Sequence, residues 1–280
     1  MQDIKLIALD LDGTLFNDNG IISDKNIEYI NKAILNGVEV VISTGRPFSG
    51  LPFKQLSSTK IKYAITTNGA GVYEIPNQKC IFGAPMDNSV SFPVIDFLLS
   101  KDIHFDIFID GKSYSPTKCL PVAKQLPVPQ SLKEYILTTR TRIDDIKGFI
   151  TENNLKIQKI TVNFKKDENG ILTDRNEVKD FLTKNPDITV VSGGYNNLEF
   201  TLKGIDKGVG LNKLAAFLNI PMESTMAIGD TENDLAIINA AAIGVAMGNA
   251  TDIVKEKADY TTLSNNDSGV AEAIKHFTCF

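Results

Sequence analysis

Short, continuous apolar runs recur at both ends of the chain, and helix-like segments lie between them. They cover residues 5–9, 38–42 and 63–65 near the start, and residues 225–228 and 243–247 near the end. Strands that are apolar throughout are typical of a parallel sheet covered by helices on both faces. We therefore expect an α/β fold with a doubly wound, Rossmann-like parallel sheet built from both ends of the chain.

The middle of the chain has a different pattern. Apolar and other residues alternate at 105–109 and again at 160–164, which is typical of strands with one covered face. We expect residues 84–200 to form an inserted α+β domain, and residues 1–83 and 201–280 to form the core domain around the parallel sheet.

Charge and cysteine content exclude several classes of protein. The net charge of −5 argues against a nucleic-acid partner, because such proteins carry a basic surplus. Cys80, Cys119 and Cys279 are far apart and show neither metal-ligand spacing nor a disulfide pattern. The acids within the first apolar run predict that it is not a signal peptide, and no apolar run is long enough to span a bilayer. We expect a cytoplasmic protein without a membrane partner, either a monomer or a weak homodimer.

The segment DLDGT at residues 10–14 directly follows the first apolar run. Residues two apart project to the same side of an extended chain, so Asp10 and Asp12 share one strand end. Two neighbouring carboxylates repel each other, and a hard divalent cation such as Mg²⁺ relieves that repulsion. Gly13 permits a sharp turn that exposes backbone N–H groups to an anion. An acidic turn after a buried strand is the plain alternative, but the full pattern favours catalysis.

A second acidic segment, GDTEND at residues 229–234, follows another apolar run. Asp230 stands at the strand end, and a starting helix returns Asn233 and Asp234 to one side. A helix with an acidic first turn explains this segment equally well by itself. Because the context of Asp10 is repeated at a second strand end, we favour a shared metal site.

Two further segments offer groups that bind phosphate. Thr44 and Gly45 follow the run at 38–42 and provide a hydroxyl and backbone amides, although an ordinary polar turn is the simpler interpretation. Lys207 begins a predicted helix, where a cation interacts unfavourably with the helix dipole. That cost is understandable if the ammonium binds an anion, although a solvated lysine is the usual state. Arg46 is left open between phosphate and substrate.

Together these segments resemble the haloacid dehalogenase superfamily of phosphohydrolases. DLDGT, STGR, the lysine of IDKG, and GDTEND resemble its four motifs, in the same order. The inserted region resembles the cap of the type IIB branch, which includes Cof-type sugar and cofactor phosphatases. TTNGAGVYE and IGVAMGNA also resemble Cof-type segments, so the resemblance covers nearly the whole chain.

The resemblance implies a Mg²⁺-dependent phosphatase that forms an aspartyl-phosphate. Asp10 would be the nucleophile, and Asp12 the general acid and base that gives Mg²⁺ only its backbone carbonyl. The implied phosphate-binding residues are Leu11, Thr44, Gly45, Lys207 and Asn233. The implied metal residues are Asp10, Asp12, Asp230 and Asp234.

The substrate is expected to be a small phosphorylated metabolite. Sugar phosphates come first, followed by phosphorylated cofactors such as flavin mononucleotide or pyridoxal phosphate. A phosphomutase of the same branch stays an alternative, as does a non-catalytic sensor, although a sensor would be expected to lack one of the catalytic groups. The cap has no comparable motif. Its polar candidates are His104, Tyr195, Asn196 and Asn197, each of which is more often a surface or turn residue.

Overall fold

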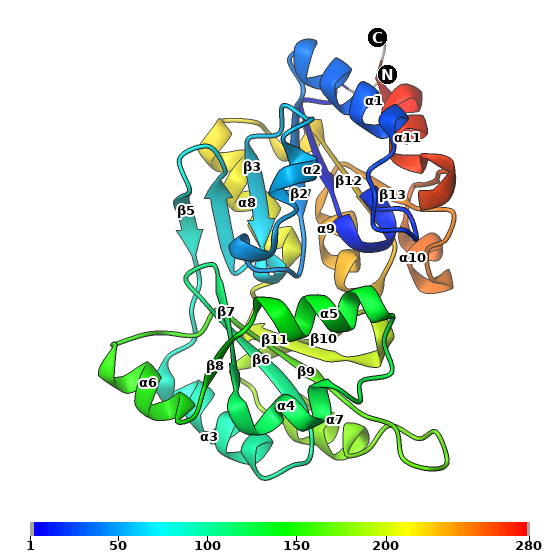
Figure 1. Ribbon diagram of the computed structural model, residues 1–280. Coiled ribbons are helices and arrows are strands. Elements are labelled where there is room, and N and C mark those ends of the chain that lie inside the picture. The colour runs from blue at the N-terminus through cyan, green and yellow to red at the C-terminus, as the bar shows by residue number, and fades with distance from the viewer. Residues whose placement is uncertain (1–2, 279–280) are drawn as a thin grey trace. The chain divides into compact units, whose positions relative to one another are not determined.

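The computed structural model describes residues 3–278, so Cys279 lies outside the described residues (Figure 1). The chain divides into two compact units, Met1–Gly83 with Asp206–Phe280, and Ala84–Ile205. The second unit ends at Ile205 rather than at residue 200, because strand β11 (Leu198–Leu202) belongs to its sheet.

The first unit contains an eight-stranded sheet in the order β14-β13-β12-β1-β2-β3-β4-β5. Strands β14 to β3 of that order pair in parallel, whereas β4 and β5 add an antiparallel edge. The predicted parallel α/β core is therefore confirmed, and the antiparallel edge was not predicted. The strands are β1 (Leu6–Leu9), β2 (Glu39–Ser43), β3 (Tyr63–Thr66), β4 (Gly71–Glu74), β5 (Lys79–Gly83), β12 (Thr225–Gly229), β13 (Ile243–Ala246) and β14 (Tyr260–Thr261).

Helices cover both faces of this sheet, which explains why its strands are apolar throughout. In β1, Ile7 and Leu9 pack on one side with helices that include α1 and α11. Leu6 and Ala8 pack on the other side with α8 and α9. The helices of this unit are α1 (Asp24–Leu35), α2 (Phe53–Leu56), α8 (Lys207–Leu218), α9 (Leu235–Ala240), α10 (Asp252–Lys257) and α11 (Gly269–Phe277). Short helical turns are η1 (Leu11–Leu15), η2 (Phe48–Gly50), η3 (Thr67–Gly69), η6 (Met222–Ser224), η7 (Glu232–Asp234) and η8 (Asn265–Asp267).

The second unit, the cap, contains a six-stranded mixed sheet in the order β10-β11-β9-β6-β7-β8. One face is apolar, and Phe105 and Ile160 pack there with α3 residues such as Val94. The strands are β6 (His104–Ile109), β7 (Lys112–Pro116), β8 (Thr141–Ile143), β9 (Lys159–Asn163), β10 (Ile188–Ser192) and β11. The helices are α3 (Asn88–Leu99), α4 (Leu120–Ala123), α5 (Gln130–Thr139), α6 (Ile146–Glu152) and α7 (Arg175–Thr183), with short turns η4 (Thr117–Cys119) and η5 (Gly194–Asn196).

The other face of the cap sheet is polar but also buried. We predicted one covered face, yet Asp106 and Lys159, which alternate with the apolar residues, are each at most 1% exposed. Lys159 forms an ion pair with Glu199 at 2.8 Å, so the buried charges are partnered.

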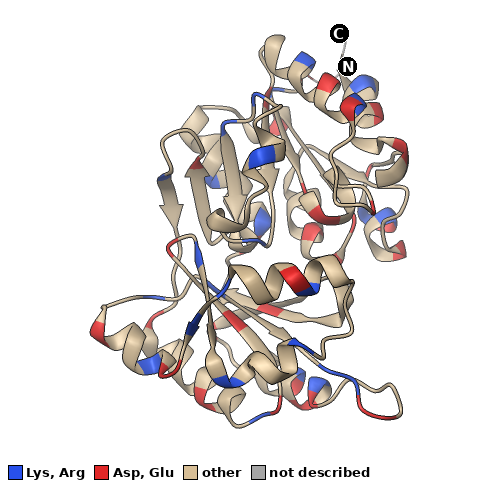
Figure 2. Cartoon of the chain, in the orientation of Figure 1, with Lys and Arg blue, Asp and Glu red and all other residues tan. Residues whose placement is uncertain are grey.

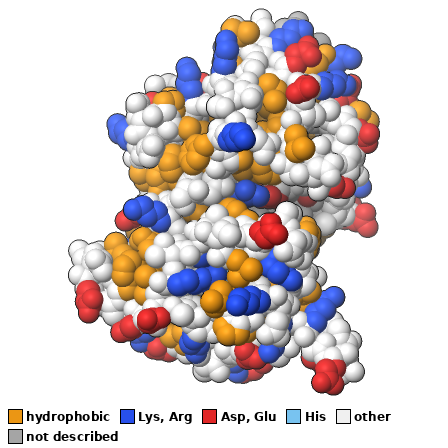
Figure 3. All heavy atoms as spheres, viewed as in Figure 1, with side chains coloured by type: hydrophobic (Ala, Val, Ile, Leu, Met, Phe, Trp, Pro, Cys, Tyr) orange, Lys and Arg blue, Asp and Glu red, His pale blue; other side chains and the backbone are white. Residues whose placement is uncertain are grey.

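Surface charge is mixed in both units. Lys and Arg are intermixed with Asp and Glu along the ribbon (Figure 2), and both kinds of side chain are present on the face in Figure 3. Across residues 3–278, every helix is too short or too polar to span a lipid bilayer.

Candidate active site

Two neighbouring strands bring aspartates to the same edge of the core sheet. β1 and β12 pair in parallel with Leu9 opposite Ile228. Asp10 is the first residue after β1, and Asp230 is the first residue after β12. Ligands of α/β proteins bind at the carboxyl ends of parallel strands. The structure therefore brings together two acidic segments that lie far apart in the sequence.

Lys207 lies between two of the carboxylates. It is the first residue of α8, whose N-cap Asp206 accepts a hydrogen bond from the backbone N–H of Val209. The side chain is fully buried, and its Nζ donates to Asp10 Oδ1 at 2.7 Å and to Asp234 Oδ1 at 2.6 Å. The unfavourable position of this cation at a helix start is thus offset by two ion pairs.

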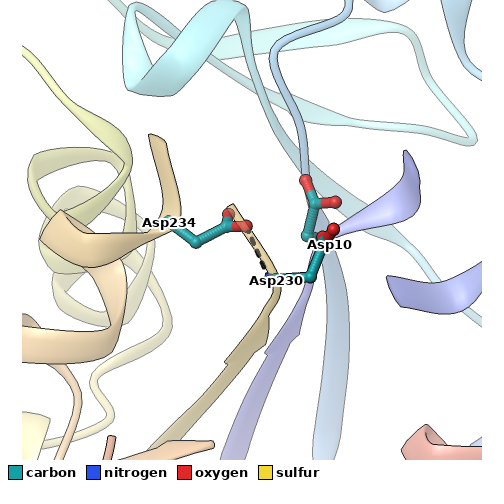
Figure 4. A group of neighbouring side chains, drawn as sticks. All are labelled: Asp10, Asp230 and Asp234. Atoms are coloured by element: carbon teal, nitrogen blue, oxygen red, sulfur yellow. Dashed lines mark hydrogen bonds between the residues drawn. The ribbon is translucent and has the colours of Figure 1, made fainter. Parts of the chain in front are cut away.

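Asp10, Asp230 and Asp234 form one buried cluster. Each offers a carboxylate oxygen, and these oxygens lie within 4.8 Å of one another (Figure 4). The second oxygen of Asp234 accepts from the backbone N–H groups of Asp230 at 3.0 Å and Thr231 at 3.2 Å. Asp234 is therefore held by protein donors on both oxygens.

Burial disfavours the ionised form of the carboxylates in this cluster. Burial first, and the charge of Asp234 second, raise the pKa of Asp10 well above its ordinary value, against the opposing effect of Lys207. The same two causes raise the pKa of Asp230 to about 7. A hard divalent cation binds carboxylate oxygen and offsets this repulsion. The residues present therefore fit a divalent metal site.

The turn after β1 places the first acidic segment directly against Asp230. Gly13 has φ +86°, and a Cβ there would lie 2.3 Å from Asp230 Oδ2, so a larger residue does not fit. Thr14 Oγ1 donates to Asp230 Oδ1 at 2.9 Å. Glycine at this position is thus required by the close approach as well as by the backbone conformation.

Asp12 stands apart from the buried cluster. Its side chain is 58% exposed and forms a two-pronged pair with Arg46, at 2.8 Å from Nε and 2.6 Å from Nη2. The guanidinium also donates to the Gly50 carbonyl and lies over the Phe16 ring. The sequence left Arg46 open between phosphate and substrate, and the structure gives it Asp12 as a partner.

The other predicted phosphate-binding residues lie at the same sheet edge with different exposure. The Leu11 side chain is fully buried, so only its backbone can meet a ligand. Thr44 follows β2, is 1% exposed and accepts from the Arg46 N–H at 3.2 Å. Gly45 is half-buried. Asn233 lies in η7, and its Oδ1 accepts at 2.9 Å from the hydroxyl of the residue two positions before it.

The sequence analysis missed one contact to the acidic turn. Asn249, in the turn after β13, donates from Nδ2 to the Gly13 carbonyl at 2.8 Å. It belongs to IGVAMGNA, which resembles a Cof-type segment, but nothing in that segment alone indicates which carbonyl its amide binds.

The polar candidates in the cap have different surroundings. His104 is fully buried, with Asn163 Nδ2 at 3.2 Å from its Nδ1 and Ser115 Oγ at 3.3 Å from its Nε2. It is therefore neither a surface nor a turn residue. Tyr195 is 55% exposed, and the two asparagines that follow it are in the same β10–β11 connection.

His104 predicts a pH dependence of stability. Burial is the main cause that lowers its pKa, with Asp106 opposing and Arg140 and Arg142 adding to the decrease. The unfolded chain binds a proton at this histidine below about pH 6.5, whereas the folded chain binds it only at lower pH. The free energy of unfolding should therefore fall as pH decreases through about 6.5, by at most about 1.4 kcal/mol per pH unit.

Urea unfolding at about pH 7.5 and about pH 5 measures this effect. His104→Gln should lose less stability between the two pH values than the wild type does. His276→Gln, at an exposed position in α11, is the matched control and should behave as the wild type. Equal losses in wild type and His104→Gln would show that His104 does not carry the effect.

Comparisons with known proteins agree with this geometry. Residues 7–274 match the haloacid dehalogenase-like hydrolase family. The chain belongs to this family. A curated relative in Bacillus subtilis, the 5-amino-6-(5-phospho-D-ribitylamino)uracil phosphatase YcsE, is 34% identical over 98% of this chain and 96% of its own length.

Solved structures of haloacid dehalogenase-like hydrolases have the same fold. One from B. subtilis has a TM-score of 0.85 at 29% identity, covering 98% of this chain and all of its own. The subclass IIB sugar phosphatase BT4131 has a TM-score of 0.79 at 25% identity, with 98% of each chain covered. The expected family, its IIB-like fold with a separate mixed-sheet cap and its phosphatase activity are thus confirmed. The chain is a phosphatase of this superfamily that acts on small phosphorylated metabolites.

Proposed function

We propose that this chain is a Mg²⁺-dependent phosphatase that passes the phosphoryl group of a small phosphate monoester through Asp10 to water. The observation that carries the proposal is the cluster at the sheet edge, where Lys207 lies 2.7 Å from Asp10 and two further carboxylates are near. A nucleophilic carboxylate, a cation and a set of metal-binding oxygens are the groups that phosphoryl transfer requires.

Asp10 attacks phosphorus, so a bond forms between its carboxylate oxygen and phosphorus while the bond to the leaving oxygen breaks. Asp12, which must first separate from Arg46 and take up a proton, gives that proton to the leaving oxygen. Asp12 then takes a proton from the water that attacks the aspartyl-phosphate, and inorganic phosphate leaves. The aspartyl-phosphate divides one difficult displacement into two easier steps. Proton transfer by a positioned acid and base contributes about 10²–10⁴ in rate.

The surrounding residues hold the phosphoryl group during both steps. The Lys207 ammonium offsets the negative charge of its oxygens, and the Thr44 hydroxyl helps to orient them. Gly45, Asn233 and the backbone at Leu11 also bind these oxygens. Arg46 releases Asp12 for proton transfer.

Mg²⁺ would be held by the carboxylates of Asp10 and Asp230 and the backbone carbonyl of Asp12, with Asp234 in support. When bound, the cation neutralises charge as two anions approach.

The candidate substrates keep the order expected from the family resemblance. Sugar phosphates come first, and the name of the Bacillus subtilis relative supports testing 5-amino-6-(5-phospho-D-ribitylamino)uracil beside them. Flavin mononucleotide and pyridoxal phosphate follow.

The test is release of inorganic phosphate from this panel by the purified protein with Mg²⁺. We expect hydrolysis of at least one compound, complete loss of activity after treatment with a chelator, and recovery when Mg²⁺ is restored. Full activity in the chelated protein would contradict the metal proposal. An isomerised sugar phosphate without released phosphate would identify a phosphomutase, and binding without any turnover would identify a sensor.

A further inference from the structure

A single turn, residues 247–251, contacts the backbone of both acidic segments. The N–H of Met247 donates to the Gly229 carbonyl at 3.0 Å, and the N–H of Thr251 donates to the Asp230 carbonyl at 3.0 Å. The side chain of Asn249 donates to the Gly13 carbonyl at 2.8 Å. The 247–251 turn therefore joins the end of β12 to the turn that follows β1.

The amide of Asn249 is held in one orientation by two different partners. Its Oδ1 accepts from the backbone N–H of Asn265 at 2.9 Å, so its Nδ2 is the atom that faces Gly13. Asn265 in turn donates from its own Nδ2 to the Phe16 carbonyl at 3.0 Å. The first acidic turn is thus held at two carbonyls, and both hydrogen bonds come from this asparagine pair.

The Gly13 peptide is a point where such a hydrogen bond matters. Glycine has few conformational preferences of its own, so its neighbours decide the orientation of the peptide. Gly13 lies directly against the Asp230 carboxylate and connects Asp12 to Thr14, which donates to Asp230. A rotation of this peptide would move Asp12 and Asp230 relative to Asp10.

We propose that Asn249 is a positioning residue for the phosphatase reaction. Its amide holds the Gly13 peptide against the end of β12 and thereby sets the separation of Asp12 and Asp230 from Asp10. The proposal rests on the proposed roles of these aspartates. Asn249 acts through Gly13, and the residue is exposed.

Two variants of Asn249 separate its contacts. Asn249→Asp keeps the shape and the acceptor for Asn265 but replaces the donor to Gly13 with a carboxylate oxygen that repels the Gly13 carbonyl, whereas Asn249→Ala removes both groups without adding a charge. With p-nitrophenyl phosphate and saturating Mg²⁺ we expect kcat to fall about 10- to 100-fold in both variants, while KM changes less than about 3-fold. Melting temperatures from circular dichroism should stay within a few degrees of the wild type.

A matched control is available at the opposite end of the sheet. Asn36 follows α1 and precedes β2, and its Nδ2 donates to the Lys32 carbonyl at 2.8 Å. Asn36→Asp removes the same kind of donor far from the carboxyl ends of the strands, and its kcat should equal that of the wild type.

Binding of Mg²⁺ alone, measured by calorimetry, gives a readout that does not depend on turnover. Asn249→Ala should bind Mg²⁺ about 3- to 10-fold more weakly, because displaced carboxylates fit the cation less well. Wild-type kcat in Asn249→Asp, or unchanged Mg²⁺ affinity in Asn249→Ala, would overturn the proposal. A wild type that binds Mg²⁺ but hydrolyses no phosphate would contradict the proposed function instead, and the calorimetric comparison would still decide the role of Asn249.

Discussion

Asp10→Asn should reduce phosphate release by roughly 10⁴-fold or more while the protein stays folded. The amide keeps the shape of the side chain but lacks the nucleophilic carboxylate, so no aspartyl-phosphate forms. Stability should change little, because Lys207 keeps its ion pair with Asp234 and one charge is removed from a buried group of carboxylates. Initial rates and urea unfolding of the same preparation measure both quantities.

A companion variant separates the nucleophile from the acid and base. Asp12→Ala should still form the aspartyl-phosphate, but slowly, and should also hydrolyse it slowly, because proton transfer in both steps is lost. Rapid-quench measurement of bound phosphate distinguishes the two variants. Appreciable turnover by Asp10→Asn would reject Asp10 as the nucleophile, and wild-type rates in Asp12→Ala would remove its role in proton transfer.

Lys207→Met should lower both stability and activity. Burial opposes the charged form of Lys207, yet Asp10 and Asp234 outweigh it and raise the pKa of the ammonium. Removing this cation leaves two buried carboxylates unpaired, which costs about 3–5 kcal/mol in the free energy of unfolding at neutral pH without Mg²⁺. Loss of charge stabilisation on the phosphoryl group should lower kcat by about 10²–10³.

The sign of the pH effect gives a second check on Lys207→Met. The pKa of Asp230 is raised to about 7 and that of Asp10 is raised as well, so the carboxylates take up protons as pH falls and the repulsion between them decreases. The stability lost in Lys207→Met should therefore shrink at low pH, and Lys207→Met with Asp234→Asn should recover part of it at neutral pH. Lys147→Met, which breaks an exposed pair with Asp96, is the control and should change stability by less than about 1 kcal/mol. A similarly small loss in Lys207→Met would mean that the buried pair contributes little.

Sequence alone identified the class of fold and the acidic segments. Residues such as Ile7 and Ala8 face opposite helical layers, and burial on both faces leaves a continuous apolar run that can be read directly. Asp10 and Asp230 were identifiable because each follows such a run, and Gly13 because a sharp turn needs it. These are local properties, encoded by neighbouring residues.

Other features are set only when distant segments pack together. Lys207 is 197 positions from Asp10, and nothing near it in sequence shows that its ammonium bridges two carboxylates. The Arg46 pair with Asp12 and the Asn249 contact with Gly13 also join separate segments. Strand order and register decide such pairings, and both depend on how the whole core is buried.

The cap illustrates the same division. Alternation in β6 correctly indicated one apolar face. From sequence neighbours alone, however, the polar residues that alternate with the apolar ones are predicted to be exposed. His104 is instead buried, because Ser115 and Asn163 on adjacent strands provide its hydrogen bonds. Sequence determined which residues alternate and where strands end, whereas the tertiary structure decided which polar groups meet, since their partners come from strands that only folding brings side by side.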